Sequence, residues 1–424
     1  MSSFTFSTLR TFVLLATLVS LIVPSFAEEC VVPASGTNAT DDAPAIVQAF
    51  EDCGQGGTIT FSADTTYYVN SVMNVTAQDA VINIQGTLVW STDIEYWLNN
   101  SLPVGYQNQS TAFVVGGDNV TIDGSGVGTL FGNGDVWYAF IKTQAETSNY
   151  PGRPHAITFN GLTNSLVTGV NFLRSQMWTM SIIYSQNVTL ENIFVNNSGS
   201  NTDGADTIRS SYINFNNWTV YNGDDSISFK GNSTNISVKN SNFYNGLGIA
   251  IGSVGQYDGE YEVIQGVSVN NVTFHATSHA YYFKTWTGTQ VGYPPNGGGG
   301  GLGDVSNMTI ENLVTNGITG AAVTIGQCTT FSSSDVPTNC TNSLVQIHDV
   351  AVTNVTGTTK SADVASLQCS AVKPCYNIEL QDIELRLVST TTYAADYLCS
   401  EVEDNIGFNC TGSACVDSSS TGEC

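Results

Sequence analysis

Three aspartates in two short segments are the residues best placed by type and spacing to do chemistry together. Asn201-Thr202-Asp203-Gly204 supplies one carboxylate, and Gly223-Asp224-Asp225 supplies two more, with Asp224 following Asp203 by 21 positions. Crowded carboxylates repel one another, so one keeps its proton and can act as an acid while the others stay ionised and activate water. This combination is typical of hydrolysis of a bond between two sugars. Each segment alone is also a common turn sequence. Only the two segments together are a specific signal for this chemistry.

The elements that must position these aspartates are short, repeated strands. From about Asn119 onward an asparagine is followed by alternating apolar and Thr or Ser residues, as in Asn187-Val188-Thr189-Leu190 and Asn307-Met308-Thr309-Ile310. Repetition of such strands roughly every 20 to 40 residues, without helical periodicity between them, predicts a solenoid. We therefore expect an all-β, single-stranded right-handed parallel β-helix, with the repeated asparagines stacked in a ladder. A β-propeller is the alternative, but its four-strand blade spacing is absent.

A solenoid of this kind would bring the three aspartates to one face. Neighbouring turns lie about 4.8 Å apart, so Asp203 and Asp224 would meet one above the other. Asp224 and Asp225 must both face outward, because an unpartnered carboxylate in an apolar core is costly. We expect Gly223 and a local turn to permit this.

The two ends of the solenoid also have sequence signals. Helical spacing over residues 43–50, preceded by Asp41 and Asp42 as candidate caps, predicts a short helix that covers the N-terminal end. The cysteine-rich tail after Cys369 is expected to close the other end. The unbroken glycine run Gly297–Gly301 is expected to form a flexible loop. Because the sequence contains no evident linker, residues 28–424 are interpreted as one domain.

The N-terminus predicts secretion. Arg10, the apolar run Phe12–Val23 and the small residues up to Ala27 are typical of a signal peptide over residues 1–27. No later stretch approaches the roughly 18 apolar residues of a membrane helix, so no membrane association is expected.

An extracellular location explains 10 cysteines, all beyond residue 27. Their spacing favours the local disulfides Cys30–Cys53, Cys328–Cys340 and Cys369–Cys375, whereas the pairing of Cys399, Cys410, Cys415 and Cys424 stays open. A zinc site is a poor competitor in these surroundings. Glycosylation sequons are expected at the surface; they include Asn38, Asn74, Asn119, Asn187, Asn217, Asn271, Asn307, Asn354 and Asn409.

The charge balance limits the partners. With 11 Lys and Arg against 36 Asp and Glu, the net charge of −25 argues against nucleic acid and anionic membranes. A polyanionic substrate would also be repelled at neutral pH unless the few cations line the site. Acidic surfaces also keep secreted proteins soluble, which alone would explain the charge. We expect a monomer.

The quoted motifs give the sequence a clear resemblance to the polygalacturonases, family 28 of the glycoside hydrolases, over most of the chain after residue 27. The segments 107–111, 132–138, 153–155 and 252–257 look most like the exo-acting fungal branch. The resemblance implies a secreted inverting hydrolase of pectin that needs no metal or cofactor. It implies that Asp224 is the general acid and that Asp203 and Asp225 hold the water. Inverting enzymes keep acid and base roughly 6.5 to 9.5 Å apart.

Two departures from the family pattern concern the substrate. The family's Gly-His-Gly is Gly246-Leu247-Gly248 here, and its Arg-Ile-Lys is Tyr282-Phe283-Lys284. In the family the histidine supports the acid, and the Arg and Lys grip the galacturonate carboxylate. Leu247 donates no side-chain hydrogen bond, and Tyr282 offers a ring face and one hydroxyl in place of a guanidinium.

We therefore expect an exo-α-galacturonidase that releases galacturonic acid from chain ends of pectin. The alternative is a galacturonohydrolase of the rhamnogalacturonan backbone, or a hydrolase with a neutral leaving sugar such as rhamnose, for which an Arg would have no purpose. The expected substrate-binding residues are Asn201, Tyr282, Lys284 and Trp286; packing is an equal alternative for Trp286. Arg153, Arg209, Lys230 and Asp206 are weaker candidates, because the sequence does not show which of them face the cleft.

Two further alternatives remain, and the choice between exo and endo cleavage stays open. A pectate lyase would need calcium and a basic residue, and a non-catalytic pectin-binding solenoid would need no triad. Exo cleavage requires loops that close one end of the cleft. The insertions at residues 90–109 and 290–303 are the candidates.

Overall fold

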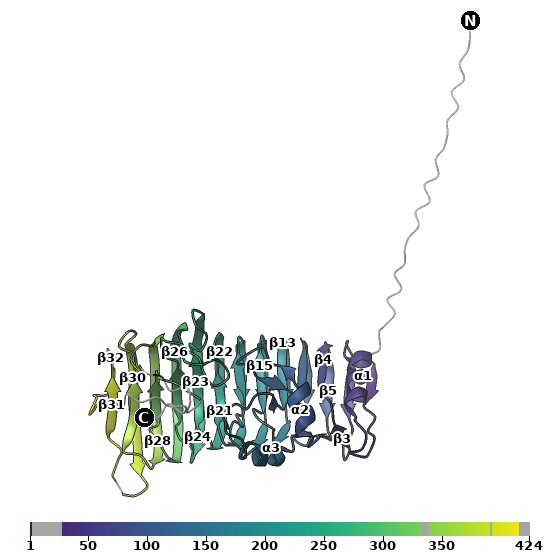
Figure 1. Ribbon diagram of the computed structural model, residues 1–424, viewed down its shortest axis with the longest axis horizontal. Helices are drawn as coiled ribbons and strands as arrows, with labels where there is room; N and C mark the ends of the chain where they lie inside the picture. The colour runs from purple at the N-terminus through teal and green to yellow at the C-terminus, as the bar shows by residue number, and fades with distance from the viewer. Residues whose placement is uncertain (2–27, 332–336, 338, 391, 415–424) are drawn as a thin grey trace.

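The computed structural model describes Met1 and residues 28–331, 337, 339–390 and 392–414. Apart from Met1, the predicted signal peptide lies outside these residues, as do Cys415 and Cys424. Short strands stack turn upon turn into a long solenoid, with α1 (Ala43–Cys53) at one end and β31 and β32 at the other (Figure 1). This is a right-handed parallel β-helix, as the strand pattern predicts.

Every turn contributes strands to parallel stacks. The stack that carries the candidate site, here called the site sheet, consists of β4 (Met73–Gln78), β9 (Phe113–Asp118), the start of β13 (Ile157–Thr168), β15 (Met180–Ile183), β18 (Asp206–Ile208), β21 (Asp225–Phe229), β23 (Gly248–Val254), β25 (Tyr281–Thr285), β27 (Val323–Gly326), β29 (Asp363–Gln368) and β31 (Asp396–Ser400).

A second stack begins at the N-terminus and runs the length of the molecule. It contains β1 (Glu29–Val31), β2 (Thr58–Phe61), β5 (Val81–Ile84), β10 (Thr121–Asp123), the end of β13, β16 (Gln186–Glu191), β19 (Ser211–Asn216), β22 (Ser233–Asn245), β24 (Tyr261–His275), β26 (Leu302–Ile318), β28 (Leu344–Thr359), β30 (Cys375–Leu387) and β32 (Val402–Glu403).

The third stack joins the second where long strands bend through a corner. It consists of β3 (Thr66–Val69), β6 (Thr87–Trp90), β11 (Thr129–Phe131), β14 (Asn171–Leu173), β17 (Phe194–Asn196), β20 (Thr219–Asn222) and the later halves of β22, β24, β26, β28 and β30. A small separate sheet is formed by β7 (Leu102–Pro103), β8 (Ser110–Thr111) and β12 (Pro154–His155). The remaining helices are α2 (Ile94–Asn100) and α3 (Gly134–Ile141).

The asparagine ladder is confirmed. Amides on adjacent turns bond to each other, for example Asn217 to Asn192 and Asn271 to Asn240, both at 2.8 Å. These residues adopt positive φ angles near 55°, which asparagine tolerates better than most residues, so they mark the corners between strands. The sequon asparagines named above are all exposed, as predicted.

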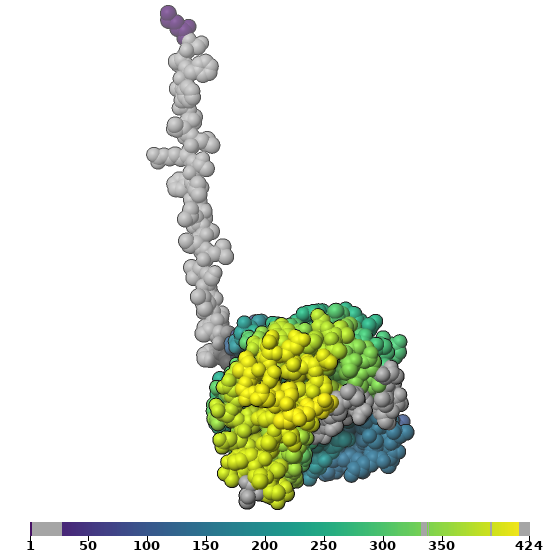
Figure 2. Space-filling model, turned by 90° about the vertical axis from the view of Figure 1, so that its left-hand side faces the viewer, coloured from purple at the N-terminus to yellow at the C-terminus, as the bar shows by residue number. Residues whose placement is uncertain are grey.

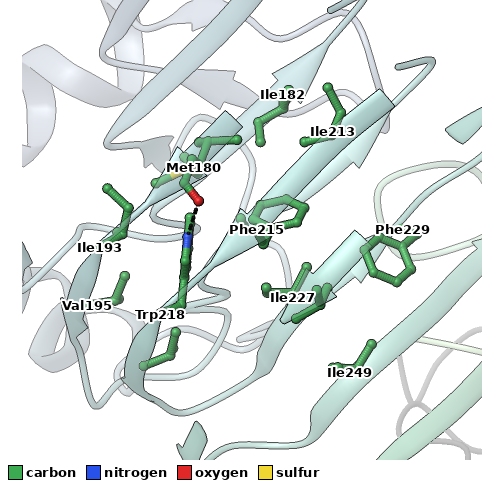
Figure 3. Packing of buried hydrophobic residues seen from close by; sticks show 14 of the residues in the cluster. Met180, Ile182, Ile193, Val195, Ile213, Phe215, Trp218, Ile227, Phe229 and Ile249 are labelled. Carbon is green, nitrogen blue, oxygen red and sulfur yellow. Dashed lines mark hydrogen bonds between the residues drawn. The ribbon is translucent and has the colours of Figure 1, made fainter. Parts of the chain in front are cut away.

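The interior is a continuous apolar core. Side chains such as Phe215, Trp218 and Ile227 from successive turns pack together, and the Trp218 Nε1–H donates to the Leu190 carbonyl oxygen at 2.9 Å (Figure 3). Each fully buried aliphatic or aromatic side chain contributes about 1.5–3 kcal/mol relative to exposure. The core holds the stacks in fixed register. It therefore also fixes the positions of the residues on their outer faces.

Both ends are covered, as the sequence predicts. Helix α1 packs on β4 and is tied to β1 by the Cys30–Cys53 disulfide. Its N-cap residue Asp42 makes no cap hydrogen bond; the Asp41 carboxylate instead accepts from the Ala43 N–H at 3.0 Å. Figure 2 shows the C-terminal residues spread across the opposite end.

The cysteines pair as predicted where the structure describes them. The disulfides Cys328–Cys340 and Cys369–Cys375 are present, and the previously unassigned Cys399 pairs with Cys410. Among the described residues, no helix is long and apolar enough to cross a membrane.

The glycine run is not the flexible loop that its composition indicates. Residues Gly297–Gly301 are buried, and their amides donate to fixed carbonyls, including Gly299 to Gln256 at 2.9 Å. A Cβ on Gly298 would lie 2.4 Å from the Gln256 side chain, and its φ of +156° suits glycine. Glycine here permits close packing of the segment 289–301 against the segment 253–257.

Candidate active site

The two aspartate segments lie on adjacent turns of the site sheet, Asn201–Gly204 just before β18 and Gly223–Asp225 at the start of β21. The Gly204 N–H donates to the Asp225 carbonyl oxygen at 2.9 Å. A Cβ on Gly204 would lie 2.2 Å from the Ser226 carbonyl oxygen, and one on Gly223 would lie 2.3 Å from that of Gly199. Both glycines are therefore required for the two turns to approach each other this closely.

A register irregularity lets neighbouring aspartates share one face. Asp225 pairs with Gly248, but Ile227 pairs with Ile249, so β21 has one extra residue at this point. Such a bulge breaks the alternation of side chains along a strand. Asp224 and Asp225 both reach the outer face, as predicted, while Ile227 enters the core.

Asp225 is held on both oxygens. The Tyr282 hydroxyl donates to its Oδ1, and the Lys284 ammonium lies 2.9 Å from its Oδ2. All three side chains are buried. These two contacts hold both carboxylate oxygens of Asp225 in place.

Asp224 is held by the neighbouring segment. Its Oδ2 accepts from the Asn201 backbone N–H at 3.2 Å and from the Asn201 side-chain amide at 3.4 Å. Burial and, after it, the Asp225 charge raise the pKa of Asp224 to about 6. Asp224 can therefore carry a proton in mildly acidic solution.

Asp203 has the most strongly perturbed environment of the three. It is 2% exposed, and its Oδ1 has no hydrogen-bond partner within the described part of the chain. Burial first, and then the charges of Asp224 and Asp206, raise the pKa of Asp203 well above its ordinary value. Asp203 and Asp224 are therefore the two members of the triad whose protonated forms burial favours.

A buried ion pair lies beneath the triad. The Lys230 ammonium is 3.2 Å from Asp206 Oδ1 and 3.9 Å from Asp225 Oδ2, and it lies 4.9 Å from the centre of the Trp178 ring. Burial raises the pKa of Asp206 to about 7, against the opposing effect of Lys230. Lys230 therefore balances two carboxylates at once.

The raised pKa values of the buried carboxyls predict a protein that is more stable in acid. In the folded chain Asp206 and Glu262 each have a pKa of about 7, whereas their ordinary values are 3.8 and 4.5. Between these values the folded state keeps protons that the unfolded state has lost, so stability falls as pH rises from about 4 to about 7. Thermal unfolding should give a higher melting temperature at pH 5 than at pH 7.5. A higher value at pH 7.5 would contradict these protonation states.

The three aspartates line a pocket of about 90 Å³. Its other lining residues are Gln107, Ser148, Asn149, Trp178, Asn201, Lys230, Leu247, Lys284 and Phe331. Both lining lysines are already paired with carboxylates. Trp178, Leu247 and Phe331 supply apolar surface, so the pocket combines a fixed acidic triad with contacts suited to an uncharged group.

Both predicted insertions reach this pocket. The Gln107 amide donates to the Gln256 side chain at 2.5 Å, and the Asn296 amide donates to the Ser148 carbonyl oxygen at 2.9 Å. Gln256 in turn donates to the Gly297 carbonyl oxygen at 3.0 Å. Four segments, 102–109, 146–153, 253–257 and 289–301, are thus cross-linked around one side of the pocket.

Two of the predicted substrate-binding residues are placed differently from the expectation. Tyr282 has no exposed surface and presents no ring face, because its hydroxyl is directed at Asp225. Trp286 is also fully buried and packs edge-on against Phe331, with ring centres 5.3 Å apart, which corresponds to the packing alternative. Lys284 and Asn201 line the pocket, but each contacts a carboxylate of the triad.

The weaker candidates for substrate binding differ in whether they reach the pocket. Lys230 belongs to the site, whereas Arg153 is buried below it and donates to the carbonyl oxygens of Gln176 and Ser200. Arg209 lies outside the pocket and donates to the Tyr184 hydroxyl at 2.7 Å. Trp178 and Phe331 were missed. They come from distant segments without a motif, and no local signal marks them.

The carboxylates are closer than the spacing expected for an inverting enzyme. One oxygen of each of Asp203, Asp224 and Asp225 lies within 4.8 Å of the others. The roughly 6.5 to 9.5 Å between acid and base is therefore not met by these nearest oxygens. A cation could bridge such a group, but the Lys230 and Lys284 ammonium groups already supply positive charge there.

The family model and the curated relatives that match this chain point to the same family. Residues 48–404 match the model of glycosyl hydrolases family 28. Alpha-L-rhamnosidase rgxB of Aspergillus niger is 52% identical over 96% of this chain and 97% of its own length. A putative galacturan 1,4-alpha-galacturonidase A, also of Aspergillus niger, is 36% identical over 86% of this chain and 90% of its own length.

Solved structures agree on the fold. Endo-xylogalacturonan hydrolase from Aspergillus tubingensis has a TM-score of 0.74 and 24% identity, over 91% of this chain and all of that one. An exopolygalacturonase from Thermotoga maritima has a TM-score of 0.66 and 16% identity, over 90% of this chain and 92% of that one.

Proposed function

The chain belongs to family 28 of the glycosyl hydrolases and is a glycosidase, and from this premise we propose that it releases L-rhamnose from the ends of rhamnogalacturonan, a pectic polysaccharide. The observation that carries the proposal is the charge of the pocket. Three carboxylates line it against two lysines, and both lysines are already paired. A uronate would find no uncommitted cation among the lining residues, whereas a neutral 6-deoxy sugar requires none.

The apolar lining supports the same substrate. A 6-deoxyhexose carries a methyl group where galacturonate carries a carboxylate. Leu247, half-buried at the pocket, replaces the histidine of the related enzymes and offers such a methyl group an apolar contact. The 52% identity to an alpha-L-rhamnosidase points in the same direction.

The proposed mechanism uses the triad as an acid and a water-holding pair. Asp224 gives its proton to the oxygen of the leaving sugar as the glycosidic bond breaks. Asp203, with Asp225 beside it, takes a proton from the water that attacks the anomeric carbon. Tyr282 and Lys284 hold Asp225 in its orientation during this step. For this step Asp224 must carry a proton and Asp203 must be ionised.

Inversion of the anomeric configuration also belongs to the proposal. Asp225 is fixed on both oxygens and so is poorly placed to form a covalent intermediate, and Asp203 is assigned to the water. We further propose that the protein is a secreted monomer. We also propose that it acts from chain ends, because the cross-linked segments around Gln107 and Asn296 form a wall on one side of the pocket.

A second candidate is exo-α-galacturonidase, the activity that the sequence motifs favour. The presence of Lys284 in the pocket supports it, because a uronate carboxylate could compete with Asp225 for the ammonium group. Chromatography of early products separates the candidates. Rhamnose monomer from rhamnogalacturonan oligosaccharides with terminal rhamnose is expected. Galacturonic acid from homogalacturonan would favour the second candidate, and a ladder of oligomers would contradict exo action.

Substitution of Leu247 tests the apolar contact. Leu247→His should lower kcat/KM for a rhamnoside about tenfold, since one methyl contact contributes about 1–3 kcal/mol to discrimination. It should not create activity on galacturonides, because the lysines stay paired. The matched control Leu247→Met keeps the volume and should retain activity. Unchanged rhamnoside kinetics in Leu247→His would show that Leu247 makes no apolar contact with the bound sugar.

A further inference from the structure

A second cavity lies away from the candidate active site, at the ends of β3, β6 and β11. It has a volume of about 370 Å³, which falls within the range of about 300–1,000 Å³ for small-molecule sites. Its walls include Tyr68, Asn70, Trp90, Asp93, Tyr96 and Asn133, and none of these lines the catalytic pocket. The proposed function gives this cavity no role. We call it the aromatic–amide pocket.

The walls of this pocket are fixed before any ligand arrives. The Asn133 amide donates to the Trp90 carbonyl oxygen at 2.6 Å. The Tyr96 hydroxyl accepts from the Val72 N–H at 3.2 Å, and the Asp93 carboxylate accepts from the Tyr96 N–H at 2.9 Å. Preorganised side chains lower the entropy cost of binding.

The pocket also has unused hydrogen-bonding capacity. Trp90 lines the cavity, but its ring is fully buried in the apolar core, so the polar contacts come from the amides. In Asn70 and Asn133 the amide nitrogen donates to backbone carbonyls, which leaves the amide oxygen to accept. A ligand with several hydroxyl groups would donate to both amide oxygens.

We propose that the aromatic–amide pocket is a second carbohydrate-binding site, specific for neutral sugars. Aromatic rings and amides together match the apolar faces and the hydroxyl groups of a sugar. Asp93 is the one charged residue among those that line the cavity, and it would repel a uronate. Neutral oligosaccharide branches are therefore the ligand class, and the acidic backbone is excluded.

A second site of this kind would anchor the enzyme to its polymer. Helix α2 begins at this pocket with Asp93 as its N-cap, and the chain after it forms the segment 102–109 beside the catalytic pocket. Binding of a branch here would raise the local concentration of chain ends without a change in the catalytic residues. Activity on a small soluble glycoside should not depend on it.

Titration of neutral and acidic oligosaccharides tests the proposal. The full chain with Asp224→Asn, which prevents turnover, is titrated by calorimetry with 1,4-β-galactotetraose, 1,5-α-arabinotetraose and tetragalacturonate. At least one neutral probe should bind, and tetragalacturonate should not compete. Adding Tyr68→Ala should weaken binding about tenfold, since a lost aromatic contact is worth about 0.5–1.5 kcal/mol. Tyr221→Ala, an outward tyrosine on β20 away from the pocket, is the matched control and should change nothing.

Several results would overturn the proposal. They are no binding of either neutral probe, equal binding of tetragalacturonate, and binding that survives both Tyr68→Ala and Asn133→Ala in proteins with unchanged melting temperatures. Binding seen only after Asn38→Gln would also overturn it, because the pocket would then hold the chain's own glycan. With native Asp224, Tyr68→Ala should slow rhamnose release from branched polymer and leave aryl glycoside turnover unchanged.

Discussion

Replacing Asp224 by asparagine should lower kcat about 10²–10⁴-fold on rhamnogalacturonan oligosaccharides, the range expected for loss of a general acid. The same variant should lose far less activity on 4-nitrophenyl α-L-rhamnoside. The nitrophenolate leaves without a proton, so the acid has little to contribute. Rates on the two substrates, measured side by side, check this.

The matched variant is Asp203→Asn. Removal of the residue that activates water should slow both substrates by similar factors, because both reactions need the water. The pKa values of Asp203 and Asp224 are both raised, and Asp224 accepts the Asn201 hydrogen bonds. If the dependence on the leaving group appeared in Asp203→Asn instead, Asp203 would be the acid and the proposed roles would be exchanged.

Lys230→Met should destabilise the protein by about 3–5 kcal/mol at pH 7.5, because it leaves Asp206 as an unpaired buried charge. The side chains of Lys230 and Asp206 are 3% and 0% exposed, so solvent cannot take the place of the lost partner. The loss should be smaller at pH 5, since Asp206 has a pKa of about 7 and can be neutral there. Urea unfolding at the two pH values measures both quantities.

The double variant Lys230→Met with Asp206→Asn provides the control. Removal of both charges should recover much of the stability, because no uncompensated carboxylate remains at that position. Equal destabilisation at pH 5 and pH 7.5, with no recovery in the double variant, would mean that Lys230 acts through packing on Trp178 and not through its charge.

The fold was predictable because its signal is repeated along the chain. Each turn repeats the same sequence pattern, in which an asparagine is followed by inward apolar residues and outward Thr or Ser. Many weak signals for a strand therefore add up along the chain. The spacing of 21 residues between Asp203 and Asp224 then placed the two turns together, and the structure confirms that β18 and β21 are neighbours. Local disulfides were predictable for the same reason, since their partners are close in sequence.

The parts of the site that escaped prediction depend on contacts distant in sequence. Tyr282 and Trp286 appeared to be available to a sugar, but Phe331 from a later turn covers Trp286, and Asp225 takes the Tyr282 hydroxyl. Lys230 could not be placed because the bulge at Asp225 shifts the alternation of side chains. The segment Gly297–Gly301 is ordered by a partner some 40 residues earlier, which local composition does not reveal.

The central claim is that the pocket selects a neutral deoxyhexose over a uronate. The most direct measurement is kcat/KM for 4-nitrophenyl α-L-rhamnoside against 4-nitrophenyl α-D-galacturonide, because the leaving group is identical and only the bound sugar differs. A uronate beside the unbalanced carboxylates costs several kcal/mol, so the rhamnoside should be favoured about 100-fold or more. A preference for the galacturonide would contradict the account.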